Sequence, residues 1–82
     1  MNLYYFHQLP SEDRATLVWE QGEFLTVRVS GNCNVCLYDM RKFFAEIWYR
    51  VEENEVEAVR GFTSNSCLEP YLNLVDLSDI IR

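Results

Sequence analysis

The sequence predicts an α+β domain with an N-terminal helix, a four-stranded antiparallel β-meander and short C-terminal helical turns packed on one sheet face. Two observations support this fold class. An apolar stripe of helical period ends at Gly22, and beyond it apolar residues alternate with period two in segments joined by short polar links. Because links this short leave no room for crossover helices, the strands are expected to form an antiparallel meander.

The N-terminal helix is expected over residues 11–21. Ser11 can cap its first turn, and Glu12 and Asp13 follow where the positive end of the helix dipole favours acidic side chains. Gly22 marks the end of the helix. The apolar stripe expected on its buried side consists of Ala15, Leu17, Val18 and Trp19.

The meander is expected to follow Gly22. Turn-forming residues separate its segments, such as Gly31 and Asn32 after the first strand. In the last segment the alternation slips at Ala58 and Val59, which indicates a β-bulge or burial on both faces. The expected strands cover residues 24–29, 35–40, 43–51 and 55–62.

The C-terminal part of the chain is expected to form only short helical turns. Ser66 and Glu69 have the spacing of a capping box, and Pro70 limits the helix that follows to one or two turns. Asp76 or Ser78 can cap a last turn, whose apolar residues are Leu77, Ile80 and Ile81.

Strand alternation sorts the side chains of the sheet into two faces. One face is almost wholly apolar, so the helices are expected to cover it. It comprises Leu25, Val27, Val29, Val35, Leu37, Phe43, Ala45, Ile47, Tyr49 and Val51. The other face interleaves aromatic rings with opposite charges, and it also takes Phe24, Cys36, Glu57 and Val59.

This second face carries the candidate interaction surface, which consists of Arg28, Tyr38, Phe44, Glu46, Trp48 and Arg50. One interpretation is a solvated outer face, on which Glu46 pairs across strands with Arg28 or Arg50. The other is a recognition surface, because Trp, Tyr and Arg dominate binding hot spots. The second interpretation predicts a non-catalytic protein-interaction module that binds a protein partner or a second copy in a homodimer.

The cysteines suggest an alternative function. Cys33 and Cys36 form a C-x-x-C motif, and with Cys67 and His7 they supply the four donors that a tetrahedral zinc site needs. However, residues three apart in a regular strand point to opposite faces, and a pair that leads into a strand lacks the helix N-terminus that lowers a thiol pKa. Packed cysteines without a cofactor are therefore expected, with a zinc-binding or thiol-redox protein as the alternative.

Size and charge exclude several classes of protein. The 82 residues allow one domain, residues 1–82, and the net charge of −6 includes no basic cluster that would bind nucleic acid. The sequence shows no signal peptide and no membrane-spanning stretch, and its odd number of cysteines favours the reducing cytoplasm. No enzyme is indicated, because the sequence contains no nucleophile with an orienting base and no glycine-rich phosphate loop.

Carboxylates cluster in the expected hairpin turn at Glu52, Glu53, Glu55 and Glu57. Such a cluster usually keeps a small protein soluble and discourages edge-to-edge pairing of strands. The alternative is that the protein is an acidic inhibitor, which docks a basic partner through this end.

Several strings of residues suggest a relationship that would cover nearly the whole chain. They are Leu17-Val18-Trp19-Glu20-Gln21-Gly22-Glu23-Phe24-Leu25, Phe43-Phe44-Ala45-Glu46-Ile47-Trp48-Tyr49, Phe62 and Leu68-Glu69-Pro70-Tyr71-Leu72. In their order they resemble a group of small uncharacterised bacterial proteins of the Bacteroidetes type. The resemblance implies a cytosolic bacterial protein of unknown function, and it transfers no activity, cofactor or functional residue.

Overall fold

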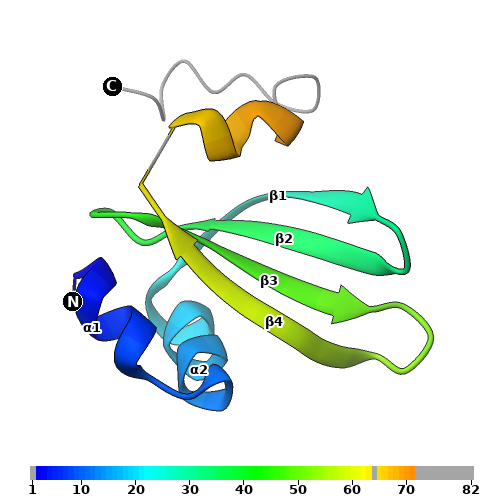
Figure 1. Cartoon of the computed structure of the whole chain (residues 1–82), viewed down its shortest axis with the longest axis horizontal. Coiled ribbons are helices and arrows are strands. Elements are labelled where there is room, and N and C mark those ends of the chain that lie inside the picture. The colour runs from blue at the N-terminus through cyan, green and yellow to red at the C-terminus, as the bar shows by residue number, and fades with distance from the viewer. Residues whose placement is uncertain (1, 64, 72–82) are drawn as a thin grey trace.

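The computed structural model describes residues 2–63 and 65–71 (Figure 1). Its helices are α1 (Leu3–Gln8), α2 (Ser11–Gln21) and the 3₁₀ helix η1 (Asn65–Tyr71). Its strands are β1 (Glu23–Ser30), β2 (Cys33–Asp39), β3 (Phe44–Arg50) and β4 (Glu55–Phe62). The strands form one sheet in the order β1-β2-β3-β4, and each is antiparallel to its neighbours. The expected α+β class and the antiparallel meander are therefore confirmed.

Helix α1 is not among the expected elements, because its 6 residues are too few to show a helical period. Asn2 caps this helix, since its side-chain oxygen accepts a hydrogen bond from the backbone N–H of Tyr5 at 3.0 Å. Phe6 is the buried residue of α1, and its ring centroid lies 5.0 Å from that of Phe43. The N-cap Asn2 is the one signal in the sequence that could have indicated this helix.

Helix α2 has the expected bounds but a different N-cap. Ser11 is its first helical residue and Pro10 occupies the N-cap position, where no side chain caps the helix. The predicted capping role of Ser11 is therefore wrong. Glu12 and Asp13 do lie in the first turn, where their charges complement the exposed backbone N–H groups. At the other end, the N–H of Gly22 bonds to the carbonyl of Val18 at 2.8 Å and closes the helix.

The expected bulge is present in β4. Trp48 and Tyr49 are neighbours on β3, but they pair with Ala58 and Val56, so Glu57 is the extra residue on β4. The bulge brings Glu57 into contact with Arg50 at 3.3 Å.

The short C-terminal helix is also present, as η1, with Pro70 inside it. The last turn predicted around Asp76 and Ser78, with Leu77, Ile80 and Ile81, lies outside the described residues.

The two faces of the sheet carry different helices: α1 and α2 lie on one face, the helix-side face, and η1 lies on the other, the η1-side face (Figure 1). The helix-side core consists of Phe6, Ala15, Val18, Phe43, Ala45, Ile47 and Val59. The η1-side core consists of Leu37, Leu68 and Tyr71, with Leu25, Phe44 and Phe62 packed against it. The expectation that the helical turns share one apolar face is therefore corrected, because η1 packs on an apolar floor of its own.

The sorting of side chains by residue number is wrong for β2. The turn after β1 pairs Ser30 with Cys33, so an even-numbered residue stands opposite an odd-numbered one. Pairing with β3 has the same consequence, since Leu37 stands opposite Glu46. Paired residues of an antiparallel sheet point to the same side. Leu37 therefore belongs to the η1-side face and Tyr38, its neighbour, to the helix-side face. The sorting is also wrong for Leu25, which packs on the η1-side core after a register shift in β1, and for Phe24 and Val59, which lie on the helix-side face.

Side chains from the helices cap the outer edge of β4. Arg14 Nη1 donates to the carbonyl of Val59 at 3.1 Å, and His7 Nε2 lies 3.2 Å from the carbonyl of Gly61. Val59 and Gly61 lie two positions apart on β4, so their carbonyls point to the same edge of the sheet. Further bonds from Arg14 to the carbonyls of Leu9 and His7, at 2.8 and 2.9 Å, hold α1 and α2 against this edge. Unpaired strand edges invite association with other chains, and β4 is protected from it.

Gly22 provides a test of the junction between α2 and the sheet. A Cβ atom at this position would lie 2.6 Å from the carbonyl oxygen of Val18 and 2.9 Å from Sδ of Met40. We expect Gly22→Ala to lower the free energy of unfolding by about 2 kcal/mol, because overpacking forces the backbone to shift. Urea unfolding followed by circular dichroism measures this change.

Glu20→Ala is the matched control, because Glu20 is an exposed residue of α2 and its replacement should change stability by less than about 0.5 kcal/mol. A Gly→Ala change without a steric conflict normally stabilises a protein by about 0.4–1 kcal/mol. A stabilised Gly22→Ala variant would therefore show that the junction is looser than described.

Candidate interaction surface

The predicted interaction surface is divided between the two faces of the sheet. Five of its residues, Arg28, Phe44, Glu46, Trp48 and Arg50, belong to the η1-side face. Tyr38 does not join them. It pairs with Ala45 and packs against the helix-side core, where its ring makes an edge contact with Phe24 at 5.7 Å. Burial raises the pKa of the Tyr38 hydroxyl.

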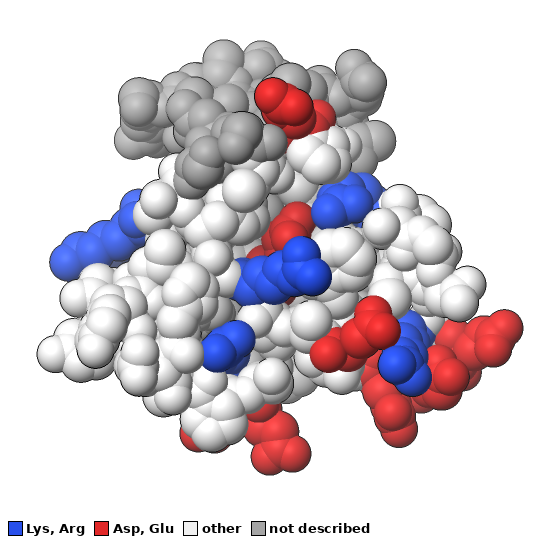
Figure 2. All heavy atoms as spheres, viewed as in Figure 1, with Lys and Arg blue, Asp and Glu red and all other residues white. Residues whose placement is uncertain are grey.

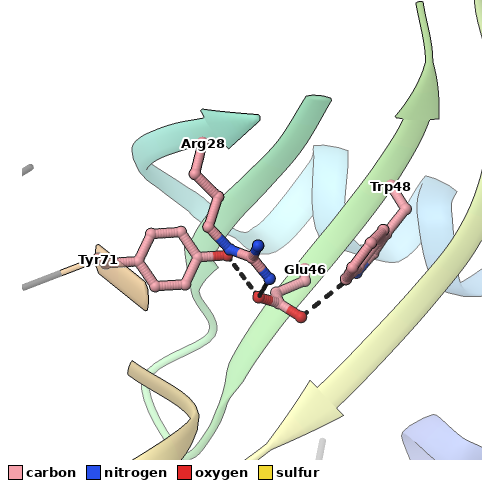
Figure 3. Close-up of polar contacts among 4 residues, drawn as sticks. All are labelled: Arg28, Glu46, Trp48 and Tyr71. Carbon is pink, nitrogen blue, oxygen red and sulfur yellow. Dashed lines mark hydrogen bonds and ion pairs between the residues drawn. The ribbon is translucent and has the colours of Figure 1, made fainter. Parts of the chain in front are cut away.

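Glu46 is the centre of a polar network on the η1-side face (Figure 3). Its side chain is nearly inaccessible, and the residue is 6% exposed. Oε2 of Glu46 accepts hydrogen bonds from Nη2 of Arg28 at 3.4 Å and from the hydroxyl of Tyr71, while Oε1 accepts from Nε1 of Trp48 at 3.3 Å. Burial, followed by the bond to Glu46, raises the pKa of Tyr71, so its hydroxyl remains a donor.

Aromatic rings enclose the cation of this network. Cζ of Arg28 lies 5.2 Å from the ring centroids of both Trp48 and Tyr71. Arg60 adds a second cation, with Cζ 4.9 Å from the Trp48 ring. Such contacts stabilise by about 0.5–2 kcal/mol each, depending on how far they are removed from water. Three of the predicted contact residues, Arg28, Glu46 and Trp48, thus bind one another and Tyr71 of η1.

The two cysteines of the C-x-x-C motif point away from each other. Cys33 pairs with Arg50 on the η1-side face, whereas Cys36 pairs with Ile47 on the helix-side face. The Cys33 thiol donates to Oε2 of Glu57 at 2.9 Å. This bond raises the pKa of Cys33 and lowers that of Glu57. A thiol held protonated in this way is a poor nucleophile and a poor metal ligand.

The other candidate ligands are also apart. His7 contacts the edge of β4, and Cys67 is an exposed residue of η1. Within residues 2–63 and 65–71, no group of three or more His, Cys, Asp or Glu side chains is close enough to hold a metal ion. The geometry of these residues therefore does not assemble the zinc site that the cysteine spacing suggested.

Part of the helix-side face is open, although its residues other than Asn34 are apolar. Val29, Asn34, Tyr49 and Val56 pair in turn and form a row with one residue on each strand. The helices cover the opposite end of this face. There Gly22, at the end of α2, packs against Tyr38, and a Cβ atom at position 22 would lie 3.3 Å from Cβ of Tyr38. At the open end Val29 is 75% exposed and Val27 is 44% exposed.

Helix α2 forms one wall of this open end. Trp19 is 52% exposed, and its Nε1 donates to the hydroxyl of Tyr49 at 2.9 Å. A pocket of about 250 Å³ lies between Trp19 and Val56, and Glu12 is on its rim. A second pocket, of about 520 Å³, lies at the β1 end of the row, where Val27, Val29 and Asn34 meet Arg28 and Pro70 of the η1 side. We call the surface formed by Trp19, Val27, Val29, Tyr49 and Val56 the open surface.

Sequence reasoning placed most of these residues correctly but missed their exposure. Val27, Val29 and Tyr49 do lie on the face that carries the helices. The small size of the helical layer could have indicated this exposure, because α1 and α2 together contribute few turns for a face that is four strands wide. A helical layer this small leaves part of the sheet open.

Comparison with known proteins found no protein family, curated protein or solved structure that matches this chain. The resemblance to small Bacteroidetes-type proteins stays a prediction. No helix in the described part of the chain has the length and apolar character to cross a lipid bilayer. Function is therefore inferred from the surfaces described above.

The Glu46 network predicts a large effect of removing one charge. We expect Glu46→Gln to lower the free energy of unfolding by about 3 kcal/mol, because it leaves the Arg28 cation partly buried without its partner. Arg50→Gln is the matched control, since it breaks the exposed ion pair with Glu57 and should cost less than about 1 kcal/mol. Urea unfolding measures both, and equal losses would contradict the central role of Glu46.

The thiol environments predict an order of alkylation. At pH 8, iodoacetamide should modify Cys67 first and Cys33 last, with rates at least about tenfold apart, because Cys33 is buried and its pKa is raised. Mass spectrometry of quenched samples follows each site. In urea the three cysteines should react alike. Rapid modification of Cys33 in the folded protein would instead support the thiol-redox alternative.

Proposed function

We propose that this protein is a non-catalytic protein-interaction module that binds its partner through the open surface. The observation that carries the proposal is the row of paired residues Val29, Asn34, Tyr49 and Val56, in which Val29 is 75% exposed and the Tyr49 hydroxyl accepts a hydrogen bond from the exposed Trp19. Single exposed apolar residues are common, but contiguous apolar surface is typical of interaction sites. Trp and Tyr are also the side chains that contribute most to binding at interface centres.

The open surface lies on the opposite face of the sheet from five of the six residues that the sequence predicts to bind a partner. On the η1-side face, Glu46 and Trp48 are engaged by Arg28, Arg60 and Tyr71. A partner would have to displace these contacts before it could bind there. At the open surface no such displacement is needed, because Val27 and Val29 already face solvent.

A photo-crosslinking amino acid at position 29 tests this proposal. We expect p-benzoylphenylalanine in place of Val29 to form specific covalent adducts when the variant is irradiated in cells of the source organism. Tyr4 provides the matched control position, because it is 69% exposed on α1 and lies outside the open surface. Adducts are detected on denaturing gels, and their mass distinguishes a second copy of the chain from another protein.

Adducts at position 29 but not at position 4 support the interaction module. No adduct at either position, or the same adducts at both, would overturn the proposal. An adduct with the mass of a dimer would identify the homodimer as the functional form.

A further inference from the structure

Strand β1 forms the second edge of the sheet, opposite the edge of β4 (Figure 1). Only two residues separate Ser30 from Cys33, so these two form a hydrogen-bonded pair, and bonded and non-bonded pairs alternate along an antiparallel ladder. Val27 and Val29 are therefore at non-bonded positions, and their N–H and C=O groups point away from β2. Within residues 2–63 and 65–71, no backbone group outside the sheet bonds to them.

The molecule leaves room for another chain beside this edge. Three consecutive residues of β1, Val27, Arg28 and Val29, line the pocket of about 520 Å³ together with Asn34 and Pro70. Their side chains point alternately to the two faces, so the pocket includes the edge of the strand. Outward N–H and C=O groups at alternate residues are matched by the backbone of an extended segment, which adds to a sheet edge as a further strand. The occupant that this edge recognises is therefore a β-strand.

The exposed part of β1 is nearly symmetric in sequence. The segment Thr26-Val27-Arg28-Val29-Ser30 lies between a register shift and the turn, and it reads almost the same in both directions. Two such segments, paired antiparallel about Arg28, set valine opposite valine and a hydroxyl side chain opposite a hydroxyl side chain. Every outward backbone group of the four valines then has a partner. Pairs of β-branched residues and pairs of hydroxyl residues both stabilise antiparallel strands.

We propose that the partner of this protein is a second copy of the chain, paired strand to strand through β1 in a two-fold dimer with one continuous sheet; this inference rests on the proposed function, because Val27 and Val29 belong to the open surface. The valines of both copies would lie together on the helix-side face. One isologous contact satisfies both unpaired edges. Because Arg14 and His7 cap the edge of β4, association through strand edges stops at two copies.

Charge does not oppose this dimer, although each copy carries a net charge of −6. Arg28 lies on the two-fold axis, but its guanidinium reaches away from the edge to the carboxylate of Glu46 on β3. The acidic turn between β3 and β4, at the lower right of Figure 2, lies on the side of the sheet away from β1. In the dimer the two turns would be about six strand spacings, or roughly 29 Å, apart, which is well beyond the screening length of about 8 Å at physiological salt.

Analytical ultracentrifugation of the full chain, from low micromolar to millimolar concentration, tests the inference. The contact of residues 26–30 is small, so we expect a reversible monomer–dimer equilibrium in the micromolar range. Hydrogen exchange locates the contact. The amides of Val27 and Val29 should exchange at least about tenfold more slowly in the dimer than in the dilute monomer, whereas the amide of Arg28, bonded to β2 in both states, is the internal control. Slow exchange of Val27 and Val29 in a monomer would show that the chain covers its own edge and would overturn the inference.

Paired charges test the register of the two strands. Val27→Lys combined with Val29→Lys sets lysine opposite lysine at both valine pairs, so it should weaken the dimer at least about tenfold, although it adds two positive charges to a chain of net charge −6. Val27→Lys combined with Val29→Glu sets opposite charges against each other and should dimerise at least about tenfold more tightly than the first variant. Both positions are exposed, so both variants should fold like the wild type, which circular dichroism checks. Equal affinities of the two variants would overturn the proposed strand pairing.

Three outcomes relate this inference to the proposed function. A monomeric chain whose position-29 adducts contain another protein overturns the inference about a second copy and leaves the interaction module in place. A monomeric chain that forms no adduct at position 29 overturns both. A dimer that is weakened by the two lysines and recovered by the lysine–glutamate combination supports both.

Discussion

The pairing of Leu37 with Glu46 determines how the rest of the molecule is arranged. It places an apolar residue of β2 beside a carboxylate of β3, on the face that η1 covers. A shift of one residue would move every side chain of β2 to the other face. Leu37 would then leave the η1-side core and Tyr38 would enter it, so both layers depend on this register.

Glu46 makes the register specific, because a buried carboxylate tolerates few arrangements. Three donors, from Arg28, Trp48 and Tyr71, converge on its two oxygens. The network joins β1, β3 and η1, which lie far apart in the sequence. Apolar packing alone would accept several positions of η1, whereas a carboxylate with fixed donors accepts one. This explains how a 3₁₀ helix of 7 residues holds its place on the sheet.

Properties that depend on neighbouring residues could be predicted from the sequence, and those that depend on pairing could not. Alternation within a segment identified the strands, and the slip near Ala58 identified the bulge, which the structure places at Glu57. The face that two strands share depends on the turn between them, so the pairing of Ser30 with Cys33 reversed the expected orientation of β2. Exposure of Val29 depends on how much of the sheet the helices reach. The sequence therefore indicates which residues could form a site more readily than it indicates their contacts and exposure in the fold.

The junction at Gly22 gives the open surface a fixed shape. Helix α2 ends at Gln21 and β1 begins at Glu23, so no linker separates the wall that carries Trp19 from the sheet. The N–H of Gly22 bonds to the carbonyl of Val18 at 2.8 Å, which ties this corner to the last turn of α2. A partner of the open surface would therefore meet a preformed shape, and the conformational entropy lost on association would fall on the partner. Selectivity should then depend on how much a partner segment must be ordered before it fits this surface.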